Sequence, residues 1–185
     1  MDSDRFWQLV DATAARAGDL EEQTELLRTE LRRLDLPDLL AFDAEFTRAS
    51  HALYTWEIMR GADIMIGDVS DDVFADFRSW VVSRGRSAYE RVLADPDAGL
   101  AALDVSDEEE VGAGELFAAV IGEVYAERTG TEIYDAFPDR PSADFPDGEP
   151  AGPDVGRNRR ERRAHFPRLA ARHQPAGKLR FPWRD

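Results

Sequence analysis

The charged side chains that could do chemistry fall in one stretch of the chain that is rich in aromatic residues. Glu57 and Asp63 share one expected helix, and Arg78 and Arg86 follow in the next two. Guanidinium groups could bind a carboxylate or a phosphate, and the carboxylates could transfer protons. If these four residues line one cleft, the chain is a small enzyme. The alternative is a set of helix-stabilising ion pairs, such as Glu57 with Arg60.

No recognised catalytic or metal-binding motif occurs in the sequence. Because there is no cysteine, thiol nucleophiles, Cys-bound zinc and iron–sulfur clusters are excluded. The three histidines do not form an H-E-x-x-H site, and neither a nucleophile elbow nor a Walker loop is present. The acidic clusters lack calcium-loop spacing. We therefore expect no metal and no cofactor, and we favour a non-enzymatic helical module that binds or regulates a protein partner, whose identity the sequence does not give.

A second group of candidate residues lies near the C-terminus. The stretch RNRRERR, residues 157–163, places five arginines in seven residues, and aromatic residues follow it. The candidate binding residues here are Arg159, Arg160, Arg162, Arg163, Phe181 and Trp183. Arginine with aromatic residues is typical of a nucleic-acid or anionic-partner motif, so RNA, DNA or an acidic protein is one class of partner. The alternative is a tail that folds back onto its own domain, with Phe181 and Trp183 as apolar anchors.

Charge divides the chain into an acidic and a basic part. The net charge is -15, and residues 151–185 carry +7, which leaves -22 for the first 150 residues. A basic tail tethered to an acidic domain is present there at a high effective concentration, which favours folding back. The acidic surface also makes nucleic-acid binding over the whole molecule unfavourable.

The composition changes at the same place as the charge. Residues 137–156 hold five of the ten prolines, together with glycine and aspartate. Proline removes backbone donors and breaks helices, so this stretch is predicted to be an extended or disordered linker. The expected organisation is a helical domain over 1–136, a linker over 137–156 and a basic tail over 157–185.

Apolar residues recur at helical spacing through the first 130 residues, and strand signals are almost absent. From Leu39 to Trp56 the apolar steps alternate between three and four, which predicts one long helix that begins at Pro37 and ends or kinks between Gly61 and Ile66. Other helices are expected over 3–17, 19–34, 70–84, 86–95 and 114–130, with a weaker one over 98–104. The sequence therefore predicts an all-α fold, a compact bundle of about six or seven helices with an Arg-rich C-terminal tail.

The N-terminal residues are acidic and then amphipathic, unlike a secretory signal, and no run of 18 apolar residues occurs. We expect a cytoplasmic protein that does not enter a membrane. Of the 23 basic residues 22 are arginine, which indicates a GC-rich bacterial genome.

The segment SDDVFADFRSWVVSRGRSAYERVLADPDAGL, residues 70–100, carries a specific pattern: S-D-D-x-F-x-x-F-R-x-W, then G-R, Y-E and a D-P-D turn. The opening DRFWQLVDAT and the closing E-x-Y-x-x-x-T-G at residues 123–130 accompany it. Over residues 2–135 the chain resembles the bacterial domain-of-unknown-function family 4240. It departs from the family at WEIMRGADIMIGDV, where a more apolar helix is expected. The resemblance implies a helical bacterial domain with no established activity, and it supplies no catalytic residues.

Overall fold

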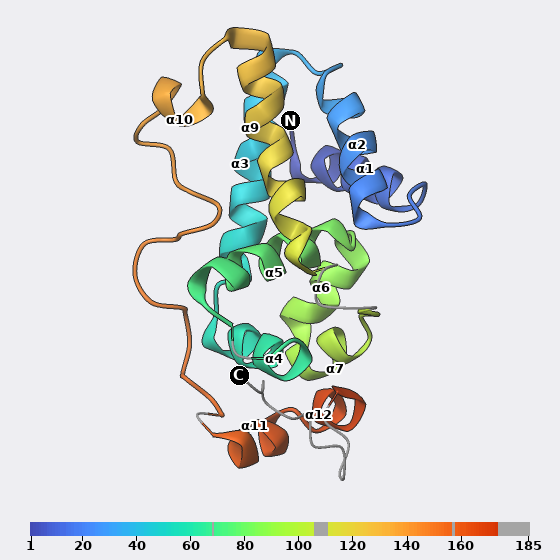
Figure 1. Cartoon of the computed structure of the whole chain (residues 1–185), viewed down its shortest axis with the longest axis vertical. Helices are drawn as coiled ribbons and strands as arrows, with labels where there is room; N and C mark the ends of the chain where they lie inside the picture. Colours follow the sequence, from blue (N-terminus) through green and yellow to red (C-terminus); the bar gives the residue numbers. More distant parts are fainter. Residues whose placement is uncertain (68, 106–110, 157, 174–185) are drawn as a thin grey trace, which may run out of the picture.

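The computed structural model describes residues 1–67, 69–105, 111–156 and 158–173, and this part of the chain is all-α, as predicted (Figure 1). Its eleven helices are α1 (Ser3–Ala14), α2 (Leu20–Leu31), α3 (Leu36–Ala52), α4 (Trp56–Met65), α5 (Asp71–Ser83), α6 (Arg86–Ala94), α7 (Pro96–Ala101), α9 (Gly114–Thr129), α10 (Ile133–Ala136), α11 (Arg159–His165) and α12 (Pro167–His173). Among the described residues, no helix has the length and apolar character needed to cross a bilayer.

Short polar side chains start most of these helices. Asp19, Asp35, Ser70 and Asp95 each accept a backbone N–H from the first turn of the helix that follows. Such caps satisfy N–H groups that have no partner within the helix. Helix boundaries are therefore encoded locally at these four positions.

The prediction of a single long helix from Pro37 to between Gly61 and Ile66 is wrong, because the chain breaks between α3 and α4. The Thr55 side chain accepts the N–H of Ile58 at 3.2 Å and caps a new helix. The N–H of Trp56 donates to the carbonyl of Ala151 at 3.0 Å, and the N–H of Ala151 donates to the carbonyl of Tyr54 at 2.9 Å. A distant segment thus satisfies the backbone groups that a continuous helix would have paired internally.

The core lies where α5 and α9 cross, with α2 and α3 packed against α9 (Figure 1). Trp80 and Phe77 on α5 are fully buried, as the apolar stripe predicts. The crossing is close at Gly114, where an added Cβ would stand 2.1 Å from the carbonyl oxygen of Asp76. This contact sets the distance between α5 and α9, which both contribute residues to the candidate site.

Residues 137–173, which we call the arm, run back along the helical domain after α10 (Figure 1). Residues 137–156 contain no helix, yet Ala143 is buried among the residues of the domain. Helices α11 and α12 then pack against α4 and α7. The division into domain, linker and tail stays a prediction, and Phe181 and Trp183 lie outside the described residues.

Candidate functional site

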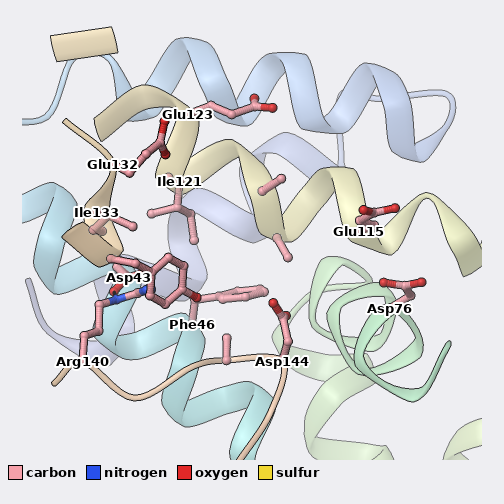
Figure 2. Close-up of a pocket in the computed structure, with 15 residues that line it drawn as sticks. Asp43, Phe46, Asp76, Glu115, Ile121, Glu123, Glu132, Ile133, Arg140 and Asp144 are labelled. Carbon is pink, nitrogen blue, oxygen red and sulfur yellow. Dashed lines mark hydrogen bonds and ion pairs between the residues drawn. The ribbon is translucent and has the colours of Figure 1, made fainter. Parts of the chain in front are cut away.

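A cavity of about 360 Å³ opens between α3, α5, α9, α10 and the arm (Figure 2). Its apolar lining includes Phe46 and Ile121, which come from two different helices. Its charged lining consists of six carboxylic acids and one arginine: Asp43, Asp76, Glu115, Glu123, Glu132, Asp144 and Arg140. The arm therefore builds one wall of a cavity whose other walls belong to the helical domain.

Among the described residues, Arg140 is the only arginine of this lining, and it is already paired. The Nε and Nη2 atoms of Arg140 donate to the two carboxylate oxygens of Asp43, which is almost fully buried. The guanidinium also lies over the ring of Tyr134, 4.8 Å from its centroid. Burial raises the pKa of Asp43, although Arg140 opposes this shift. Glu123 pairs with Arg28 of α2 at 2.5 Å. The cavity carboxyl groups that form no ion pair with a described residue are therefore Asp76, Glu115, Glu132 and Asp144.

Asp76 and Glu115 lie at one end of the cavity, and the Asp144 carboxyl points into the cavity from the arm (Figure 2). Partial burial raises the pKa of Asp76 to about 6, with further contributions from Glu115 and Asp144. Burial also raises the pKa of Asp144, while Arg78 and Arg140 lower it. These carboxylates lose solvent and repel one another, so a positively charged group placed among them would be stabilised.

Arg78 fixes the arm at this wall. It is fully buried, and its Nη1 donates to the Oγ of Ser50 at 2.8 Å and to the carbonyl of Ala143 at 3.1 Å. Its Nη2 donates to the carbonyl of Asp144. Burial lowers the pKa of Arg78 to about 10, so it stays charged near neutral pH. Arg78 is thus a structural residue that positions the backbone of Asp144.

The structure separates the four residues of the proposed catalytic cleft. Glu57 and Asp63 both lie on α4 and pair with residues of α11. Arg78 is buried between α3 and the arm. Arg86 lies at the start of α6, where it pairs with Asp4 of α1 at 2.6 Å and with Glu90 at 2.7 Å. None of the four lines the cavity described above.

The candidate arginines of the tail have different surroundings. Arg162 pairs with Asp63 at 3.1 Å. Arg159 and Arg160 are exposed, Arg163 is half-buried, and none of these three forms an ion pair with a described residue. Of these four candidate arginines, only Arg162 forms an ion pair with the helical domain. The charges of the other three are not balanced by a described carboxylate.

Sequence reasoning missed Asp76, Glu115 and Asp144. Asp76 carries a readable signal, because it is a carboxylate placed between the apolar Phe74 and Phe77 on one helix. Asp144 carries none, because it belongs to the Pro-rich stretch that was interpreted as a linker. Its place in the cavity depends on the contact between the arm and Arg78.

Among known proteins, a family model described as "Protein of unknown function (DUF4240)" matches residues 1–127. No curated protein and no solved structure shows a significant similarity to the chain. The resemblance carried by the central motif is thereby confirmed. The matched residues include α1 to α7 and most of α9, whereas the arm lies beyond them.

Proposed function

The chain belongs to the DUF4240 family, whose description names no activity, and we propose that it is a non-enzymatic binding module whose acidic cavity takes an arginine side chain of a protein partner. The observation that carries this proposal is the charge of the cavity lining: of its six described carboxylic acids, Asp43 pairs with Arg140 and Glu123 pairs with Arg28, and the other four form no ion pair with a described residue. A cationic group would neutralise the charges of these four, which are Asp76, Glu115, Glu132 and Asp144.

The lining favours a guanidinium over a simple ammonium ion. A guanidinium can donate two parallel hydrogen bonds to a carboxylate and can stack on an aromatic ring. The cavity offers both kinds of contact, since Phe46 and Tyr134 line it beside the carboxyl groups. A volume of about 360 Å³ falls in the range of small-ligand pockets, so one long side chain fits with room for water.

Exposed apolar residues near the cavity support a protein as the source of the arginine. Tyr134 lines the cavity and is 47% exposed. Leu116 and Phe145 adjoin the lining residues Glu115 and Asp144 in sequence and are 51% and 56% exposed. Tyrosine and phenylalanine are enriched at protein interaction sites.

The test is an NMR titration of the full chain at pH 7.5 with N-acetyl-arginine methylamide and with its neutral analogue, N-acetyl-citrulline methylamide. We expect the arginine compound to shift the signals of Ala118 and Gly122, which line the cavity, and the citrulline compound to bind at least about tenfold more weakly. The double variant D76N/E115Q should lose about tenfold in affinity, which corresponds to about 1.4 kcal/mol.

The matched control is D147N, which removes an exposed carboxylate of the same arm that does not line the cavity. Its affinity should equal that of the wild type. Equal binding of the two compounds, or an equal loss in D147N and D76N/E115Q, would rule out the cavity as the site.

A second candidate function is proton transfer by Asp76, because a carboxyl group with a pKa of about 6 can act as a general acid or base near neutral pH. The variant D76N separates the two roles. A binding role predicts weaker binding of the arginine compound, whereas a catalytic role predicts retained binding of a substrate and lost turnover.

A further inference from the structure

The outer surface of α4 and α7 receives two apolar side chains of the arm. Phe166 and Leu169 are fully buried there, although α11 and α12 lie at the edge of the molecule (Figure 1). Gly61 of α4 makes room for Leu100 of α7, since an added Cβ would stand 2.4 Å from Leu100 Cδ1. Leu169 and Phe166 pack beside the same position, at 3.6 Å and 3.8 Å from that Cβ. We call the surface formed by α4 and α7 the α4–α7 surface.

Three ion pairs and one hydrogen bond between a histidine and a carboxylate surround this apolar contact. The acidic partners belong to the domain and to the loop after α7, and the basic partners belong to the arm. The pairs are Asp63 with Arg162 at 3.1 Å, Glu57 with His165 at 2.8 Å, Asp95 with Arg168 at 3.1 Å and Asp104 with Arg172 at 2.6 Å. Each pair contributes little alone because most are exposed, but together they fix the direction and register of the bound segment.

The α4–α7 surface also recognises the start of a helix. The backbone N–H groups of Arg168 and Leu169, in the first turn of α12, donate to the carboxylate of Asp97 at 3.2 and 2.9 Å. Asp97 belongs to α7, so the domain provides the cap that α12 does not supply itself. A helix of seven residues is unstable alone in water, and α12 therefore depends on this surface for its helical form.

The α4–α7 surface lies inside the matched family domain, whereas the arm that covers it lies outside. From this separation we infer that the α4–α7 surface is a binding site for a basic protein segment that forms a short helix with Phe and Leu three residues apart. The arm occupies the site in the same chain, and a partner protein with such a segment competes with it. This site is separate from the cavity of the proposed function.

The inference can be tested with a fluorescent peptide of residues 158–173, NRRERRAHFPRLAARH, added to the full chain. Wild type and the variant F166A/L169A are compared, since the variant weakens the arm without changing the domain surface. We expect the peptide to bind the variant at least about tenfold more tightly than the wild type. A peptide that itself carries the two alanines should bind neither protein.

A second variant, R168E/R172E, weakens the arm through exposed charges and leaves Phe166 and Leu169 in place, and it should also bind the peptide more tightly. The control is R159A/R160A, two exposed arginines of the arm without a described ion pair, which should behave as wild type. Circular dichroism checks that every variant folds. Equal peptide affinity in all proteins would overturn the inference, and so would unfolding of both arm variants, which would make the arm an integral part of the domain.

Discussion

At this site a buried residue contributes by fixing the position of neighbouring backbone segments. Arg78 illustrates this, because its guanidinium is buried and most of its partners are carbonyl oxygens, from Ser50, Ala143 and Asp144. It forms no ion pair with a described carboxylate and instead joins α3 to the arm. The acidic wall of the cavity depends on this contact.

The variant R78M should therefore destabilise the protein by roughly 2–4 kcal/mol, since it leaves buried carbonyl groups without donors. Urea unfolding of the full chain measures the loss. The control is S79A, the next residue on α5, which is equally buried but whose Oγ has no hydrogen-bond partner among the described residues. S79A should change stability by no more than about 0.5 kcal/mol. If the two variants lose the same stability, the hydrogen bonds of Arg78 contribute nothing specific.

Among the helices, local capping residues predicted where several of them start, whereas contacts with distant parts of the chain determined the break before α4 and the position of Asp144. The caps at Asp19 and Ser70 are legible in the sequence, and the helices that follow them were predicted. The break before α4 was not predicted, because it requires Ala151, which is far along the chain. In the same way, Asp76 could be noticed on an apolar helix, whereas Asp144 enters the cavity only through the packing of the arm.

The close crossing of α5 and α9 can be tested through its contribution to stability. The variant G114A places a Cβ against the carbonyl of Asp76 and should cost about 1–3 kcal/mol, because one helix must move. The matched variant G122A changes the same helix where the nearest atom is Ile133 Cγ2 at 3.8 Å, and it should stabilise the protein by about 0.5–1 kcal/mol through helix propensity. Urea unfolding of both variants gives the comparison. Similar effects in the two would show that the close crossing has no energetic role.

The whole molecule is an acidic domain followed by a basic C-terminal part. The first 150 residues carry -22 and the last 35 carry +7. The arm contributes the carboxylate of Asp144 to the cavity wall, whereas its basic helices α11 and α12 cover the α4–α7 surface, so only this second site lies where basic groups of the arm meet the acidic domain. A domain of this charge attracts any cation, and attraction alone is no sign of a specific site.

The central proposal, that the cavity takes a guanidinium, is tested most directly by the pH dependence of binding. Only ionised carboxylates attract the cation, and the raised pKa of Asp76, about 6, places its ionisation above that of ordinary carboxyl groups. The affinity of the full chain for N-acetyl-arginine methylamide should therefore rise about tenfold between pH 4.5 and pH 7.5 at constant ionic strength, with its midpoint near pH 6. In D76N the step near pH 6 should disappear, although all three histidines remain. An identical pH profile in both proteins, or an affinity that falls as the pH rises, would contradict the proposal.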